Sequence, residues 1–178
     1  MWLASVSFGV LYNYWALILR IAFPIIQRHN LISFVCLDYF FDFIFVFDIL
    51  VQSRTGFLSE GQLVLLSSQM WRHYVFSSGF IFDCLSVLPL DFLFFKLGYQ
   101  PLVRLGRLLK CNRFFLFCER GEIYSGRPKL FNLIKLLHYL FLIIHWVACL
   151  YFIVSRYEGL GSEKWVHPKL EEEWAEVS

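Results

Sequence analysis

Four cationic side chains recur at every third position of an otherwise apolar stretch. They are Arg104, Arg107, Lys110 and Arg113, and the residues between them are mostly leucine, valine, phenylalanine and cysteine. A cation at the centre of a bilayer costs several kcal/mol unless it is paired or hydrated. Four cations in register therefore predict a helix, residues 101–120, whose charges face an acidic or polar partner.

The spacing also fixes the direction in which these cations project. Three residues of α-helix turn through about 300°, so each cation is offset by about 60° from the one before, and the four form a slow spiral. If the helix tightens to 3₁₀ geometry, with three residues per turn, the spiral becomes a single stripe. The pattern is typical of a voltage-sensing helix. The alternative is an amphipathic helix that lies on the membrane surface with its basic face in water.

Carboxylates that can pair with this stripe lie in two other apolar segments. Asp38, Asp42 and Asp48 fall within residues 31–51, and Asp83 lies in a later segment. On a helix the first three project within about a third of the circumference, which gives that segment one acidic face. We expect the four acids to be the counter-charges of the four cations. The alternative for Asp38 and Asp48 is hydration at a membrane boundary.

The composition predicts a polytopic, all-α membrane protein. Of 178 residues, 58% are hydrophobic and only 17% are charged, and mean hydropathy is +0.59. Soluble domains are about half apolar and a quarter charged. The formal charge of +2 says little about partners, because the position of the charges along the chain matters more. We expect a lipid bilayer as a partner and no nucleic acid.

Five apolar segments are candidates to cross about 30 Å of hydrocarbon. They are residues 2–26, a run that we expect to stop near Pro24, residues 31–51, residues 74–88 with a second part at 91–95, the basic helix, and residues 130–154. The first segment lacks the charged start and cleavage site of a signal peptide, so we expect it to be a span. Residues 52–71 are expected to form a loop. The short connection at residues 96–100 predicts that the third and fourth spans are adjacent and antiparallel.

Positive charge sets the expected orientation in the membrane. Arginines and lysines gather after the second span and after the basic helix, at Arg54, Arg72, Arg120, Arg127 and Lys129. Cytoplasmic loops carry an excess of Lys and Arg. We therefore predict a cytoplasmic N-terminus and an extracellular, acidic segment at residues 157–178.

Motifs for catalysis or metal binding are absent from the sequence. It contains no HxxxH cluster, nucleophile elbow, Cys-x₅-Arg loop or glycine-rich phosphate cradle, which argues against an integral membrane enzyme. The five cysteines have no CxxC spacing and are expected to be reduced and buried. His138 and His145 share a helix face, but two histidines do not complete a metal site, so we expect packed, hydrogen-bonded histidines and no metal.

Three stretches resemble the transmembrane part of cyclic nucleotide-gated cation channels, and the likeness covers nearly the whole chain. They read LDYFFDFIFVFDILVQSRTGFLSEGQLV, LSVLPLDFLFFKLGYQPLVRLGRLLK and HWVACLYFIVSRYEGLGSEKWVHP. The RTGFL run followed by Gly-Gln-Leu-Val, and the short connection before the basic helix, favour this family over hyperpolarisation-activated and ether-à-go-go-type relatives.

The resemblance implies four parts of the chain. These are a voltage-sensor-like four-helix domain at residues 1–118, a cytoplasmic interfacial linker at 119–130, an outer pore helix at 131–156, and an extracellular segment at 157–178 that leads towards a pore loop. It also implies a homo- or heterotetramer in the plasma membrane that opens in response to ligand, with weak voltage dependence and poor selectivity among Na⁺, K⁺ and Ca²⁺. The basic helix would couple to the pore through four linker residues, Glu119, Arg120, Arg127 and Lys129.

In the family, a pore loop, an inner helix and a domain that binds cAMP or cGMP would follow Pro168. None of these can be recognised in the sequence, so we expect a sensor portion that conducts only when a pore completes it. One alternative is a truncated, non-conducting assembly partner. Another is the sensor domain of a related potassium or hyperpolarisation-activated channel. A stand-alone proton-conducting sensor fits poorly because of the fifth span.

Overall fold

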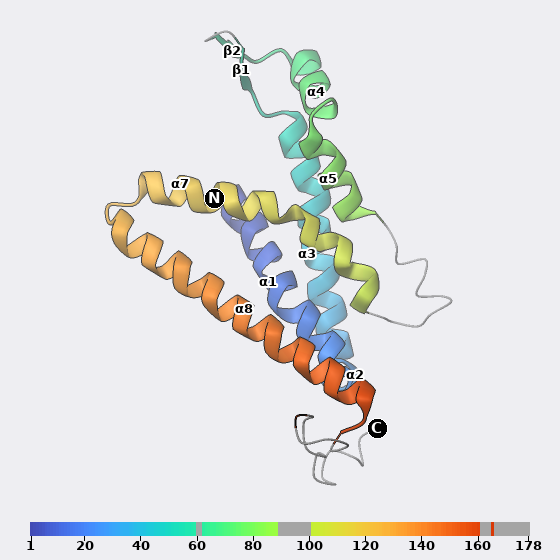
Figure 1. Ribbon diagram of the computed structural model, residues 1–178. Helices are drawn as coiled ribbons and strands as arrows, with labels where there is room; N and C mark the ends of the chain where they lie inside the picture. The colour runs from blue at the N-terminus through green and yellow to red at the C-terminus, as the bar shows by residue number, and fades with distance from the viewer. Residues whose placement is uncertain (60–61, 89–100, 161–164, 166–178) are drawn as a thin grey trace.

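The structure is a computed structural model that describes residues 1–59, 62–88, 101–160 and 165 (Figure 1). In chain order its elements are α1 (Trp2–Ala22), α2 (Pro24–His29), α3 (Leu31–Ser53), β1 (Phe57–Ser59), β2 (Gln62–Val64), α4 (Ser67–Val75), α5 (Ser78–Val87), the 3₁₀-helix η2 (Pro101–Lys110), α7 (Cys111–Tyr124) and α8 (Pro128–Glu158). The predicted all-α class is confirmed, with one small β-hairpin as an addition.

The first apolar run, residues 2–26, stops as a single helix close to Pro24, as the sequence analysis expected. Helix α1 ends at Ala22, and Pro24 is the first residue of α2. Proline lacks a backbone N–H and clashes with the preceding turn, but it is well tolerated at the first position of a helix. The predicted polar connection at residues 27–30 is therefore mostly the end of α2.

Residues 52–71, predicted to be a loop, contain ordered elements. Strands β1 and β2 pair antiparallel, with Phe57 opposite Val64, and α4 begins at Ser67. The imidazole of His73 on α4 stacks on the Phe57 ring with 3.9 Å between ring centroids. The hairpin lies beyond the end of α3, at the top of Figure 1.

The predicted third span is not a single helix from residue 74. Helix α4 ends at Val75, and α5 begins at Ser78 after a bend in which the Ser77 hydroxyl donates to the Tyr74 carbonyl at 2.8 Å. The ten residues of α5 cover about 15 Å, or half of a bilayer's hydrocarbon. The predicted segment 91–95 and the predicted connection 96–100 lie outside the described residues.

The basic helix changes geometry along its length. Its first ten residues form η2, and the chain continues from Cys111 as α-helix. Runs of 3₁₀-helix longer than three or four residues are uncommon. Helix α1 packs against η2, α7, α8 and α3, while α5 packs against η2 and α3. Helix α7 also packs against α8, so the basic helix lies among α1, α5 and α8.

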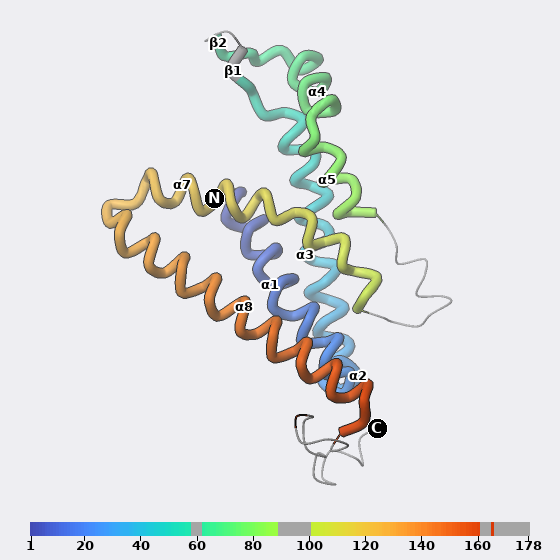
Figure 2. The backbone as a smooth tube through the Cα atoms, viewed as in Figure 1, coloured from blue at the N-terminus to red at the C-terminus, as the bar shows by residue number. Residues whose placement is uncertain are grey.

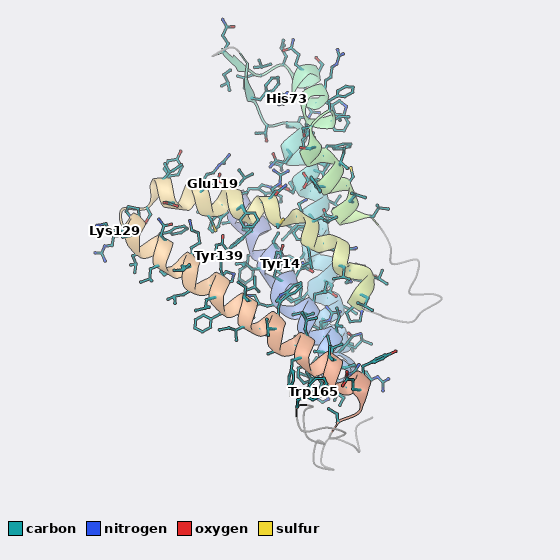
Figure 3. All side chains as sticks on the ribbon, in the orientation of Figure 1. Tyr14, His73, Glu119, Lys129, Tyr139 and Trp165 are labelled. Atoms are coloured by element: carbon teal, nitrogen blue, oxygen red, sulfur yellow. The ribbon has the colours of Figure 1, made fainter. Side chains whose placement is uncertain are left out.

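Helices α7 and α8 form a hairpin with a three-residue connection, residues 125–127, which is clear in the backbone tube of Figure 2. Most of the predicted linker is thus helical: residues 119–124 are the end of α7, and α8 begins at Pro128. A buried apolar cluster fills the space between α1, α3 and α7; its residues are Val6, Val10, Phe45, Phe114 and Cys118. Tyr14 and Tyr139, labelled in Figure 3, pack against this cluster.

By length and composition, α1 and α8 could each cross a membrane. Helix α3 is also long enough, at 23 residues, but it carries three carboxylates. Most of the apolar side chains of α8 face outward; Leu136 and Ile143, for example, are 64% and 61% exposed. An apolar exterior around a charged interior is the reverse of a soluble bundle and fits a lipid environment.

Candidate functional site

The 3₁₀ geometry of η2 places its cations on one line. With three residues per turn, Arg104, Arg107 and Lys110 lie above one another, and each is at most 3% exposed. Arg113 follows in the first turn of α7. We call these four cations, together with Asp38, Asp42, Asp48 and Asp83, the charge ladder.

The first half of the ladder joins η2 to α3 and α1. Arg104 lies 2.8 Å from the Asp42 carboxylate and 3.4 Å from that of Asp38. Arg107 binds Asp42 through two nitrogens, Nε and Nη2, at 3.0 Å each. Arg20 on α1 donates from Nη1 to both carboxylate oxygens of Asp38, at 3.0 and 2.9 Å. Two acids thus hold three arginines from two helices.

The second half joins η2 and α7 to α3 and α5. Lys110 Nζ lies 3.2 Å from Asp48 and 3.6 Å from Asp83, and it donates to the Phe45 carbonyl at 2.9 Å. Arg113 pairs with Asp48 at 3.1 Å through Nε and with Asp83 through Nη2. Both carboxylates therefore bridge the same two cations.

Neutral donors and aromatic rings complete the coordination of the buried charges. Trp2 Nε1 donates to Asp48 at 3.0 Å, the Tyr12 hydroxyl to Asp38 at 3.0 Å, and the Tyr74 hydroxyl to Asp83 at 2.7 Å. The Lys110 ammonium lies 5.2 Å from the centroid of the Phe45 ring. Such contacts replace water around ions that burial has desolvated.

The pairing holds otherwise costly charges inside an apolar bundle. Removing one partner of a buried pair typically costs about 3–5 kcal/mol, because the other charge stays buried without compensation. Among the four acids, burial is deepest at Asp48, with a side chain that is 0% exposed, and shallowest at Asp42, at 17%. Together with Arg20, the ladder can therefore join five helices electrostatically, namely α1, α3, α5, η2 and α7. Any sliding of η2 along α3 would have to exchange partners.

The sequence analysis named the eight residues of the ladder, and the structure brings all eight together. It missed Arg20, which is 2% exposed and adds a further buried cation beside Arg104, Arg107 and Lys110. The signal was present, because Arg20 interrupts an apolar run just as the four ladder cations do. The donors Trp2, Tyr12 and Tyr74 carried no comparable signal, since aromatic residues are common throughout the chain.

The four predicted linker residues, Glu119, Arg120, Arg127 and Lys129, are all exposed. Among the described side chains none of them forms an ion pair. A residue between them, Glu122, instead accepts from Asn132 at 2.7 Å and from Lys135 at 3.1 Å. These two hydrogen bonds hold the pKa of the Glu122 carboxyl below its usual value. The polar connection between α7 and α8 therefore centres on Glu122.

Side chains of α8 donate to backbone carbonyls of α1. Trp146 Nε1 lies 3.0 Å from the Tyr14 carbonyl, and His145 Nε2 lies 3.1 Å from that of Trp15. Arg156 Nη1 reaches the Ala22 carbonyl at 3.3 Å, in the last turn of α1, where carbonyls lack helical partners. Helix α8 is thus fixed to α1 along its second half.

Two expectations about histidine and cysteine need correction. His145 is hydrogen-bonded as predicted, but the buried Nε2 of His138 has no hydrogen-bond partner within the described part of the chain. Cys118 and Cys149 are buried, whereas Cys36 and Cys84 are exposed on the apolar exterior. Outward-facing cysteine is compatible with a lipid-facing surface, where small apolar residues need no burial in protein. The described residues contain no group of three or more metal-ligating side chains.

A helical bundle with a buried basic helix points to channels and transporters, and comparison with known families decides between these classes. The sequence model of a family described as ion transport protein matches residues 1–176. The chain belongs to the ion transport protein family.

Several curated ion transport proteins are similar along 95% of this chain. Human cyclic nucleotide-gated channel alpha-3 is 39% identical over 170 residues, and rat cyclic nucleotide-gated channel alpha-2 is 36% identical over 170 residues. The cyclic nucleotide-gated channel cone photoreceptor subunit alpha of Gallus gallus is also 39% identical. The chain spans 24%, 26% and 23%, respectively, of the length of these relatives.

Proposed function

We propose that the chain is the sensor-like domain and outer pore helix of a subunit of a cyclic nucleotide-gated cation channel. The observation that carries the proposal is the buried charge ladder, in a chain 36–39% identical to channels of that name. In this proposal the subunit joins a homo- or heterotetramer in the plasma membrane. The complete channel passes Na⁺, K⁺ and Ca²⁺ and opens when cAMP or cGMP binds to a further domain.

The ladder acts as a scaffold in this proposal. Arg104, Arg107, Lys110 and Arg113 are the sensor charges, and each has a carboxylate within 3.2 Å. Displacement along the membrane normal would break several short, dry ion pairs at once. The membrane potential therefore moves the basic helix little, and ligand binding supplies the energy for gating.

The α7–α8 hairpin couples the scaffold to the pore. Its connection is three residues long, and Glu122 links the two helices near the turn. The exposed residues Glu119, Arg120, Arg127 and Lys129 are free to meet a cytoplasmic gating element, such as a nucleotide-binding domain. The positive charge on this side supports a cytoplasmic location for the hairpin and an extracellular location for residues 157–178.

A chimera tests the proposal. The matching segment of human cyclic nucleotide-gated channel alpha-3 would be replaced by this chain, and currents would be recorded from excised inside-out patches. We expect a cation current that appears with cGMP or cAMP and disappears on washout, as in the unmodified human channel recorded in parallel. Normal surface delivery without any nucleotide-dependent current would contradict the proposal. Suppression of the current of a co-expressed intact channel would then favour a non-conducting assembly partner.

A further inference from the structure

Two cavities adjoin at the end of the bundle where α1, α2 and α8 meet. One has a volume of about 350 Å³ and is lined by Arg20, Gln27, Arg28 and Arg156, among others. The other, of about 320 Å³, shares Arg28 and Arg156 and is otherwise mainly apolar. Ligand pockets typically measure about 300–1,000 Å³. Together the cavities form a space with a cationic half and an apolar half.

The apolar half is built from the ends of the two membrane-length helices. Phe23 and Ile25 line it from the α1–α2 junction, Phe152 from α8, and Leu160 from just beyond the end of α8. The rings of Phe23 and Phe152 stack with 4.4 Å between centroids and form a rigid wall. A hydrocarbon chain suits such a wall better than water does.

The cationic half offers guanidinium groups that are available for an anion. Arg28 and Arg156 are exposed, and neither forms an ion pair with any residue that the structure describes. Arg156 is held in place by its bond to the Ala22 carbonyl at 3.3 Å. Guanidinium groups bind phosphate oxygens through parallel, charge-assisted hydrogen bonds.

The cavities lie at the level of a membrane–water boundary. Helices α1 and α8, which could each cross a membrane, end beside them at Ala22 and Glu158. Tyr157 and Trp165 are exposed at the same end, at 94% and 48%, and Figure 3 shows Trp165 below the end of α8. Exposed tyrosine and tryptophan are characteristic of the headgroup region of bilayers.

We propose that this paired cavity binds one phospholipid, with its phosphate between Arg28 and Arg156 and the upper part of an acyl chain against Phe23, Phe152 and Leu160. An amphiphile fits this space because Arg28 and Arg156 line both cavities, so a phosphate bound to them lies next to the apolar half. The bound lipid would link α2 to the end of α8 and so tie the sensor-like domain to the outer pore helix.

Native mass spectrometry of the purified chain, titrated with dimyristoylphosphatidylglycerol, tests the proposal. The double variant Arg28→Gln/Arg156→Gln is expected to weaken lipid binding by about tenfold or more, because it removes both charge-assisted contacts. The matched control is Arg54→Gln/Arg72→Gln, two arginines at the opposite end of the bundle, which should bind as the unmodified chain does. Leu160→Trp, which fills the apolar half and leaves the arginines in place, should also weaken binding.

Three results would overturn the proposal. The first is equal binding by the unmodified chain and the Arg28/Arg156 variant, with thermal unfolding showing that both are folded. The second is binding of glycerol 3-phosphate as tight as that of the lipid, which would identify a phosphate site without a lipid function. The third is lipid binding that appears only after residues 161–178 are removed, which would identify the acidic segment as the natural occupant.

Discussion

At the scale of single residues, the ladder depends on acids that each serve two cations. Asp48 and Asp83 both bridge Lys110 and Arg113, while Asp42 bridges Arg104 and Arg107. The loss of one carboxylate therefore affects two cations at once. Its cost depends on how dry the remaining charges are, because water can compensate a charge that it reaches.

Neutralising Asp48 should be more costly than neutralising Asp42. The Asp48 side chain is fully buried, whereas that of Asp42 is 17% exposed and Arg104 also contacts Asp38. We expect Asp48→Asn to lower the free energy of unfolding by about 3–5 kcal/mol and Asp42→Asn by clearly less. Thermal unfolding in detergent and surface delivery in cells would measure both. A larger loss of unfolding free energy in Asp42→Asn than in Asp48→Asn would mean that burial does not determine which substitution costs more.

Arg20 should be energetically coupled to Asp38. The two side chains are 2% and 1% exposed and share two short hydrogen bonds. A double-mutant cycle with Arg20→Gln and Asp38→Asn should give a coupling energy of about 0.5–3 kcal/mol. Asp38→Asn alone should cost more than Arg20→Gln alone, because Asp38 also faces Arg104. Additive effects of the two substitutions would exclude a direct interaction.

The hydrogen bonds of Glu122 should make the α7–α8 hairpin sensitive to acid. Bonds from Asn132 and Lys135 lower the pKa of this carboxyl in the folded state. A lowered folded-state pKa contributes stability above the unfolded-state value and loses it as pH falls through the folded-state value. The stability difference between the unmodified chain and Glu122→Gln should therefore be constant at neutral pH and shrink below about pH 4.3. A difference that persists well below that pH would show that the charge of Glu122 is not involved.

At the scale of elements, the α7–α8 hairpin depends on a close approach at one glycine. A Cβ atom at Gly121 would lie 2.6 Å from Cζ of Phe131 on α8, whereas a Cβ at Gly126 would meet no atom within 4 Å. The first position needs glycine for packing. The second tolerates a side chain, because it lies in the turn and faces open space.

Valine should therefore be tolerated at Gly126 but not at Gly121. Gly121→Val is expected to displace Phe131 and to destabilise the chain by about 1–3 kcal/mol. Gly126→Val is the matched control and should unfold close to the temperature of the unmodified chain. Phe131→Leu, which shortens the opposing side chain, should recover part of the loss in Gly121→Val. Equal effects at the two glycines would show that the steric contact with Phe131 is unimportant.

At the scale of the whole molecule, the part of the fold that rests on charge was predictable and the part that rests on local backbone geometry was not. Buried cations require partners, so the spacing of Arg104 to Arg113 and the acids of α3 predicted one another. The same rule, applied to Arg20, would have predicted an acidic partner for this residue too. The change from 3₁₀ geometry in η2 to α geometry in α7 could not be predicted, because a three-residue spacing of cations is compatible with both helix types.

The features that the sequence analysis missed have no distinctive pattern in the sequence. Strands β1 and β2 have three residues each, too few for an alternating pattern to stand out. The bend at Ser77 contains no proline, and its serine hydroxyl turns back to the Tyr74 carbonyl through a contact that only the folded chain shows. Glu122 was overlooked among other charged residues, because its partners lie ten and thirteen positions further along the chain.

In the proposed function, the ladder holds its four cations in place, and the complete channel opens in response to ligand rather than voltage. The voltage dependence of the open probability of the chimera, measured without nucleotide and at several fixed nucleotide concentrations, tests this directly. Each charge that crossed the whole field would contribute about 2.3 kcal/mol per 100 mV, so four moving cations would give a steep dependence. We predict a shallow dependence, much weaker than one such charge would produce, at every nucleotide concentration. Steep voltage-driven opening, above all without nucleotide, would show that the ladder cations move and would identify the basic helix as a mobile voltage sensor.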